Sequence, residues 1–228
     1  MNSIIVRYSE IGLKGNNKSD FELKLVRNIK LSFKKNNILF EKIERRFSRI
    51  IIITNEKADL SKIYGIASYS YAEKTEKDFE KIKESIIILT NEFTNETTFR
   101  VSAKRLDKNF PLSSTDIERT LGGLVVEKTG AKVNLKCFEK EVGVEIMDKE
   151  AYSFINKIKG PGGLPIGIEG NVIALIEDED SINAAMLMMK RGCDIIPVGF
   201  DEKNIDLLNL YSPKELMTYD NKQKNIFK

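Results

Sequence analysis

Residues 3–33 read SIIVRYSEIGLKGNNKSDFELKLVRNIKLSF. The first six of them, residues 3–8, are mostly apolar and β-branched, which favours a strand. A polar loop with two glycines follows, and Ser19 is of the residue type that caps helix N-termini. From Phe21 onward, apolar side chains recur every four residues with lysines on the other faces, a spacing that predicts an amphipathic helix. The stretch therefore predicts a strand, a loop and a helix in succession.

The residues that follow complete a small domain. The sequence predicts strands at 41–46 and 49–54, a short helix at 60–66 and another strand at 68–74. The order is then β-α-β-β-α-β, which is the ferredoxin-like arrangement. We therefore assign residues 1–74 to an N-terminal ferredoxin-like domain.

A second α/β domain is predicted over residues 75–160. Four polar residues, 113–116, offer helix N-caps, and Gly130 is suited to the position just after a helix. The predicted elements are a helix at 79–93, a strand at 98–104, a helix ending at 130, and strands at 142–147 and 152–158. Residues 160–165 read GPGGLP, which can continue neither a helix nor a central strand, so we take them as a hinge.

The last segment, residues 161–228, is predicted to hold one β-α-β unit. Its strands are expected at 172–176 and 194–200, and its helix at 182–191, with Gly192 just after the helix. A parallel sheet needs several such units to cover both of its faces. The segment is therefore expected to be part of a larger architecture, and the whole chain belongs to the α+β class.

The composition excludes several kinds of chemistry. Hydrophobic residues make up 41% and charged residues 31% of the chain, which has no His and two Cys. Without His, the chain has no Ser-His-Asp or Cys-His pair and no His-ligated zinc. Cys137 and Cys193 are expected to be buried thiols. No apolar run is long enough to span a bilayer, so we expect a cytoplasmic protein without a membrane partner.

The net charge of +3 is distributed unevenly. From Met1 to Arg49, twelve Lys and Arg stand against five Asp and Glu, or +7; from Pro161 to Lys228, seven stand against eleven, or −4. A basic end is typical of a surface that binds a polyanion, although a solvated lysine-rich surface would give the same count. The distribution predicts a nucleic-acid contact in the N-terminal part.

Three stretches resemble one known family. Residues 6–17 (VRYSEIGLKGNN) are similar to the opening of the tRNA 4-thiouridine synthetases, also called thiamine-biosynthesis sulfurtransferases. Lys104-Arg105, Lys108 and Phe110-Pro111 resemble the THUMP domain of that family. Residues 162–167 (GGLPIG) and 188–192 (MMKRG) resemble its junction into an ATP-pyrophosphatase, or PP-loop, domain. The resemblance is collinear from Ile4 to about residue 200.

Membership of this family implies a ferredoxin-like domain and a THUMP domain that together grip the tRNA acceptor arm. A PP-loop domain would then adenylate a uridine before sulfur transfer, and dimers would present RNA from one subunit to the other. Cations in the gripping half would contact phosphates, and Phe110 could stack on an exposed base. The RNA-binding residues expected from composition and resemblance are Arg7, Lys14, Lys18, Arg45, Arg46, Lys104, Arg105, Lys108 and Phe110.

The chain departs from the family at the PP-loop. Where the family has Ser-Gly-Gly-x-Asp-Ser, residues 176–181 read IEDEDS, which keeps only the final Asp and Ser. Glycines let backbone N–H groups approach phosphate oxygens, whereas carboxylates repel them. We therefore expect no ATP, no other cofactor, no metal and no catalytic residue. The degenerate PP-loop comprises Glu177, Asp178, Glu179, Asp180 and Ser181; its acidic side chains could also bind a divalent cation or dock another protein.

These observations lead to three functional hypotheses. The first is a tRNA-binding protein with a truncated, inactive PP-loop half that performs no sulfur transfer of its own. The second is a subunit of a tRNA thiolation enzyme, if a separate catalytic or sulfur-carrier protein supplies the ATP and sulfur chemistry. The third is a protein-interaction module that docks through its acidic end. The family's sulfur-carrying cysteines are expected in regions beyond this segment, and Cys193, at the start of a strand, is not expected to be reactive.

Overall fold

The computed structural model describes residues 2–8, 10–13, 15–199 and 205–217. The chain forms two compact units, which are described separately. The first unit comprises Met1–Ile5, Ile51–Asn55 and Ser70–Ile158. The second comprises Val6–Ile50, Glu56–Tyr69 and Lys159–Lys228. Four strands, β1 (Ser3–Arg7), β3 (Arg49–Ile53), β4 (Ser68–Glu76) and β9 (Ile158–Lys159), contribute residues to both units.

A mixed sheet forms the centre of the first unit. Its strands lie in the order β3-β1-β4-β8-β7-β5-β6. Strand β8 is antiparallel to β4 and to β7, whereas β5 is parallel to β7 and to β6. Arg100 on β5 is paired with Glu141 on β7, and this register places the two side chains on the same face. The remaining strands are β5 (Thr98–Arg105), β6 (Lys132–Val133), β7 (Lys140–Ile146) and β8 (Glu150–Ile155).

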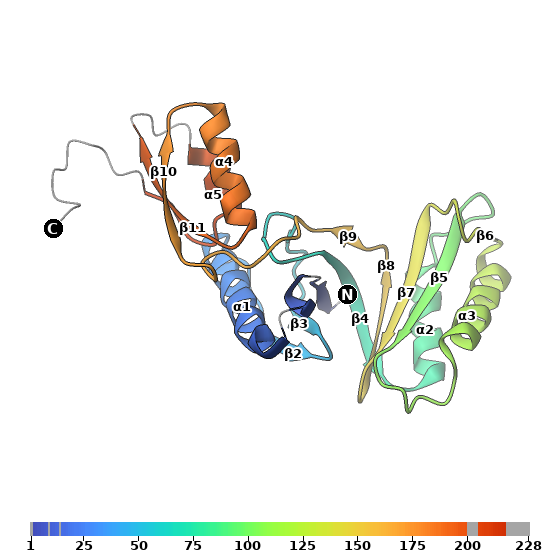
Figure 1. Cartoon of the computed structure of the whole chain (residues 1–228). Helices are drawn as coiled ribbons and strands as arrows, with labels where there is room; N and C mark the ends of the chain where they lie inside the picture. The colour runs from blue at the N-terminus through green and yellow to red at the C-terminus, as the bar shows by residue number, and fades with distance from the viewer. Residues whose placement is uncertain (1, 9, 14, 200–204, 218–228) are drawn as a thin grey trace. The chain divides into compact units, whose positions relative to one another are not determined.

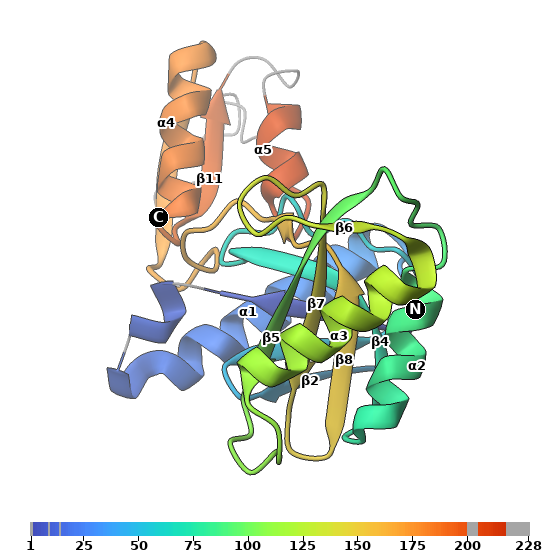
Figure 2. The same cartoon turned by 90° about the vertical axis from the view of Figure 1, so that its right-hand side faces the viewer.

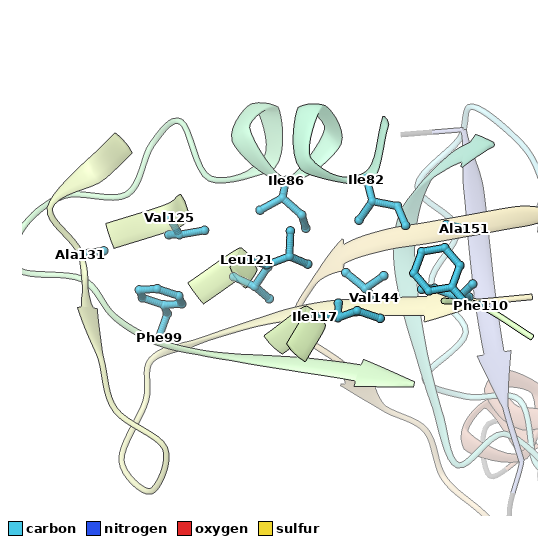
Figure 3. Close-up of a cluster of buried hydrophobic side chains, with 12 residues drawn as sticks. Ile82, Ile86, Phe99, Phe110, Ile117, Leu121, Val125, Ala131, Val144 and Ala151 are labelled. Carbon is cyan, nitrogen blue, oxygen red and sulfur yellow. The ribbon is translucent and has the colours of Figure 1, made fainter. Parts of the chain in front are cut away.

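Two helices, α2 (Phe79–Leu89) and α3 (Ser114–Thr129), cover one face of this sheet (Figure 2). Alternate residues of β5 and β7 point toward these helices, so Phe99 and Val144 meet Ile86 and Leu121 in one core (Figure 3). Helix α3 ends at Gly130, whose left-handed φ of 73° confirms the predicted stop. Helix α2 ends earlier than predicted, at Leu89, and the hydroxyl of its C-cap, Thr90, donates to the carbonyl of Ile86 at 2.8 Å.

The other face of the same sheet carries a second core in the first unit. Tyr152 and Phe154 of β8 pack with Ile5, Ile51 and Ala72. The Phe154 ring lies over Gly143 so closely that a Cβ at residue 143 would be 2.1 Å from ring atoms. A residue without a side chain is therefore required at Gly143 for the ring to lie flat on the sheet.

Helix α1 (Lys18–Lys35) dominates the N-terminal part of the second unit. The periodicity prediction is confirmed, since Phe21, Leu25, Ile29 and Phe33 are all buried. Two 3-10 turns, η1 (Glu10–Leu13) and η2 (Gly15–Asn17), precede the helix, and β2 (Lys42–Arg46) follows it and lies beside β3. The predicted Ser19 N-cap is wrong. The helix begins two residues earlier than this cap implies, after Asn17, and the Ser19 hydroxyl instead accepts a hydrogen bond from Arg45 at 3.1 Å.

The helix predicted at residues 60–66 is absent, and the segment forms successive turns instead. Gly65 has a φ of +98°, outside the helical region, and its N–H donates to the carbonyl of Gly162 at 2.8 Å. An added Cβ at Gly65 would lie 3.2 Å from Leu25 and from Pro165. Hydrogen bonds and close packing with distant residues override the local helical pattern here.

The C-terminal part of the second unit contains the predicted β-α-β unit, which is confirmed (Figure 1). Strands β10 (Asn171–Ile176) and β11 (Asp194–Gly199) are parallel, and α4 (Glu179–Lys190) connects them. Helix α5 (Asp206–Tyr211) follows, while the two-residue β9 (Ile158–Lys159) pairs with β4. Two side chains of α1 join this part to the rest of the unit: Asn28 donates to the carbonyl of Ile166 at 3.1 Å, and Lys35 to that of Asn209 at 2.6 Å.

The predicted fold class, α+β, agrees with this architecture. The domain boundaries at residues 74 and 160 stay a prediction, as does the interpretation of the C-terminal β-α-β unit as a remnant of a PP-loop domain.

Candidate nucleic-acid interface

The predicted cations fall into two groups, one in each unit. Lys18, Arg45 and Arg46 lie in the second unit, at the start of α1 and on the hairpin formed by β2 and β3, and we call them the hairpin group. Lys104 and Lys108 lie in the first unit, at the end of β5 and in the loop that follows, and we call them the loop group. Each group is described within its own unit.

The hairpin group is organised around Glu22 of α1. Arg45 Nη1 lies 3.3 Å from one Glu22 carboxylate oxygen, and Lys18 Nζ lies 3.7 Å from the other. Lys18 also donates to the hydroxyl of Ser48 at 2.7 Å, which ties the hairpin tip to the helix. About a third of the Lys18 and Arg45 side chains is exposed, at 35% each. Both cations are therefore held in place and still reach solvent.

Arg7 and Lys14 do not add to this group in the same way. Arg7, in β1, is only 8% exposed, so its guanidinium is largely enclosed by the second unit. Lys14 lies outside the described residues. The neighbouring Tyr8 donates to Glu22, and burial together with this carboxylate raises the pKa of the phenol above its usual value. Tyr8 thus remains a neutral hydrogen-bond donor that helps to fix Glu22.

Lys104 and Arg105 point to opposite faces of β5, as adjacent strand residues must. Lys104 is exposed, on the face away from α2 and α3, whereas Arg105 is half-buried and donates from Nη1 to the carbonyl of Phe110 at 3.2 Å. Arg105 therefore braces the loop that follows β5. Of the three cations predicted around this loop, Lys104 and Lys108 are exposed.

The loop that carries Lys108 is anchored at several points. Lys77 Nζ lies 2.6 Å from an Asp107 carboxylate oxygen, and this bond, with one from the backbone of Asn109, lowers the pKa of Asp107. Just beyond Lys108, Phe110 is 5% exposed and lies in the core (Figure 3). Its ring centroid is 6.4 Å from that of Phe79. The stacking role predicted for Phe110 is corrected on this ground, because its ring is a core anchor.

The sequence did not reveal a charged network on the face of the sheet opposite α2 and α3. Glu141 is buried and accepts from Lys157 and Ser102 at 2.7 Å each and from Arg100 at 3.2 Å. Burial alone would raise the pKa of Glu141, but hydrogen bonds from Lys157 and Ser102 and the charges of Lys157 and Arg100 hold it below its usual value. The guanidinium of Arg100 also lies 4.1 Å from the centre of the Phe138 ring. The alternation of Arg100, Ser102 and Lys104 along β5 was the available signal.

In the acidic turn between β10 and α4, backbone N–H groups are hydrogen-bonded to side chains of the same turn. Asp178 accepts from the backbone N–H of Ser181 at 2.8 Å, and the hydroxyl of Ser181 accepts from the N–H groups of Glu177 and Asp178 at 3.0 and 2.9 Å. This capping box also lowers the pKa of Asp178, first through the backbone bond from Ser181. Three N–H groups at the turn and the helix start are thus already hydrogen-bonded.

A cavity of about 480 Å³ lies in the second unit beside α1 and α5. Tyr64 and Tyr211 stack in its wall with centroids 5.3 Å apart, and burial raises the pKa of Tyr64 to about 12. Lys35 lines the cavity too, but its Nζ donates to the backbone carbonyls of Asn209 and Ser212, and burial lowers its pKa. Lys35 thus caps the C-terminal end of α5.

The described residues also bear on the cysteines, on metal-binding clusters and on membrane-spanning helices. Cys193 is buried as expected, but Cys137 is exposed, in a turn where its N–H donates to the side chain of Asn134. Across residues 2–8, 10–13, 15–199 and 205–217, no three His, Cys, Asp or Glu side chains are grouped to hold a metal ion. No described helix combines the length and the apolar run that crossing a bilayer needs.

Comparison with known proteins matches both domains. The model of the ThiI ferredoxin-like domain matches residues 3–70, and the THUMP domain model matches residues 76–156. A relative named "Probable tRNA sulfurtransferase" from Thermococcus kodakarensis is 39% identical over 208 residues, which are 86% of this chain and 55% of that protein. The chain thus spans about half the length of the curated relatives it matches.

Two solved structures are similar over nearly the whole chain. PH1313 from Pyrococcus horikoshii Ot3 is 36% identical, with a TM-score of 0.90 over 98% of this chain and 80% of that one. A 4-thiouridine synthetase solved with RNA and bound ATP is 29% identical, with a TM-score of 0.82 over 96% of this chain and 61% of that one.

The fold and the matched models define a THUMP-domain protein with a ferredoxin-like domain in front of the THUMP domain. Within that class, the similarity to full-length relatives is specific: the chain belongs to the tRNA sulfurtransferase, or 4-thiouridine synthetase, family. The family resemblance read from the sequence is confirmed.

Proposed function

We propose that the chain binds tRNA by its acceptor arm, through phosphate contacts from the hairpin and loop groups. The observation that carries this proposal is the presentation of Lys108, an exposed cation on a loop fixed by the Lys77–Asp107 ion pair, the Arg105 bond and the buried Phe110 ring. Because the backbone of this loop is already fixed, less conformational entropy is lost when Lys108 meets a phosphate. The solved relative bound to RNA supports RNA as the ligand.

The contacts available to these cations are those of phosphate recognition. Lysine ammonium groups bind phosphate oxygens as point charges, so binding should weaken as salt rises and depend little on base sequence. Arg46, in the hairpin group, lies 2.6 Å from Glu44, an ion pair that a phosphate could replace. The proposed site therefore binds RNA mainly through the attraction between its cations and the phosphates.

The test is tRNA affinity across a salt series, measured by fluorescence anisotropy with intact tRNA and with tRNA that lacks its single-stranded acceptor end. The double variant Lys104→Ala/Lys108→Ala should bind more weakly and lower the salt slope by about 2. Arg105 is left unchanged because it braces the loop. The matched control, Lys81→Ala/Lys128→Ala, removes two exposed lysines from the helices and should bind as the wild type does. Equal affinity of both double variants would refute the loop contact, and absence of binding by the wild type would refute the function.

We further propose that this segment does not bind ATP in the manner of a glycine-containing PP-loop. Phosphate binding at a helix N-terminus needs free backbone N–H groups, and here those of Glu177, Asp178 and Ser181 are bonded to side chains. The carboxylates of the turn would also repel a triphosphate. As part of this proposal, we expect the chain alone to have no sulfurtransferase activity.

A second candidate function is a role in tRNA thiolation together with a further catalytic or sulfur-carrying chain. One observation favours it: on the parallel pair β10 and β11, Ile173 and Leu175 are 58% and 51% exposed, although parallel sheets are normally covered on both faces. The test is the 4-thiouridine content of tRNA from cells with and without the gene. Loss of the modification on deletion would support participation, and an unchanged content would exclude it.

A further inference from the structure

The tip of the β2–β3 hairpin has an unusual backbone. Its two loop residues, Phe47 and Ser48, both have left-handed conformations, with φ of 48° and 59°. Two-residue hairpin turns of this kind favour Asn and Gly, because a bulky side chain is strained at positive φ. A phenylalanine here is therefore not explained by the turn itself.

Burial does not explain the residue either. The Phe47 side chain is 46% exposed, at the end of a hairpin rather than in a core. A large apolar ring in a strained and half-exposed position stabilises the fold little. Such outliers point to a contact made with another molecule.

The surroundings of the ring are rigid and cationic. Lys18 holds the Ser48 hydroxyl at 2.7 Å, and Arg49 Nη1 donates to the Ser48 carbonyl at 3.0 Å. Arg45 bonds the carbonyl of Ser19 at 3.3 Å, which fixes the hairpin against the start of α1. The tip thus presents an aromatic ring, next in sequence to Arg46, on a turn that Lys18 and Arg45 tie to the start of α1.

We infer that Phe47 is a stacking platform for an unpaired base of the bound RNA, with Lys18, Arg45 and Arg46 placed for the flanking phosphates. The inference rests on the proposed function and adds to it the part of the RNA that is recognised. An aromatic ring next to cations is the pattern by which proteins hold single-stranded nucleotides, whereas a base inside a duplex has no free face to offer. The ring takes the role that the sequence assigned to Phe110.

The first experiment removes the ring and keeps the turn. Asn tolerates positive φ, so Phe47→Asn should fold at least as well as the wild type, as its thermal midpoint will show. It should bind intact tRNA roughly tenfold more weakly and a blunt-ended acceptor-stem duplex equally well. The matched control, Leu39→Asn, removes another exposed apolar side chain, 75% exposed, and should leave both affinities unchanged.

The second experiment uses the absence of Trp from the chain. Phe47→Trp introduces a single indole at the hairpin tip, which should retain tRNA binding and lose fluorescence when a base stacks on it. Leu187→Trp, at an exposed position of α4, should not respond. If the wild type binds tRNA and Phe47→Asn binds it as tightly, or if the indole at the tip is not quenched, the inference is overturned while the proposed function stands. If the wild type binds no tRNA, both are overturned.

Discussion

Glu141 shows how a buried charge is stabilised by its neighbours. Its side chain is 8% exposed, and three donors from β5 and from the residues after β8 surround the carboxylate. The donors compensate for lost hydration, which is why the ionised form is favoured in spite of burial. The network joins Arg100 and Lys157 on one side of the sheet.

Replacing this carboxylate should destabilise the fold in a pH-dependent way. We expect Glu141→Gln to lower the free energy of unfolding by about 2 kcal/mol at neutral pH, because two cations lose their partner. The folded-state pKa lies below the ordinary value of 4.5, so the contribution is present above that pH and is lost as pH falls through the lower folded-state value. Urea unfolding from pH 7 down to about 3 measures it. A stability gap that stays constant over this range would contradict the assignment, and the exposed Glu139→Gln is the control.

At the scale of elements, two glycines differ in whether the fold has room for a side chain at their position. Gly143 of β7 lies under the Phe154 ring, whereas Gly123 of α3 has no atom within 4 Å of where a Cβ would be. The first is determined by packing between β7 and β8. The second leaves an exposed helix position without the stabilisation that alanine gives.

Alanine substitutions at the two positions should therefore act in opposite directions. Gly143→Ala should lower the free energy of unfolding by about 1–3 kcal/mol, because the buried ring cannot move aside freely. Gly123→Ala should raise it by roughly 0.5–1 kcal/mol through helix propensity. Thermal or urea unfolding of each variant checks the signs, and a stable Gly143→Ala protein would show that the ring repacks.

Elements could be predicted from the sequence where a pattern is local. The four-residue spacing of α1, the stop at Gly130 and the β10-α4-β11 unit all follow from neighbours in the chain. The turns at residues 60–66 could not be predicted, because the hydrogen bond from Gly65 to Gly162 joins residues far apart in sequence.

The sequence predicted where the basic residues of the candidate site are concentrated, but not which of them are exposed. Composition identifies the basic N-terminal part, but it does not reveal that Arg7 is buried or that Arg105 braces a loop. An aromatic residue before a proline can be a core or a surface residue, and the Phe110 ring lies in a core that forms only when α2 and α3 cover the sheet. Exposure depends on tertiary packing, which one sequence does not display.

For the whole molecule, the sharpest prediction concerns nucleotides. A ligand that binds only the native state raises the thermal midpoint, by an amount that grows with the logarithm of its concentration once this exceeds the Kd. We therefore expect the midpoint of the chain to be unchanged by millimolar Mg-ATP and to rise with tRNA at low salt, where the grip is strongest. Differential scanning fluorimetry measures both. A rise with Mg-ATP would contradict the proposed loss of triphosphate binding and would require the Asp178–Ser181 bonds to open.

The closed turn of Asp178 and Ser181 has a practical consequence. Because its amides are satisfied by its own side chains, the turn supplies its own anion and depends on no solute to keep its shape. Many helix starts that bind phosphate acquire an ion from the buffer, which then competes with the ligand under study. Exchanging a phosphate buffer for an amine buffer should therefore leave this turn unchanged.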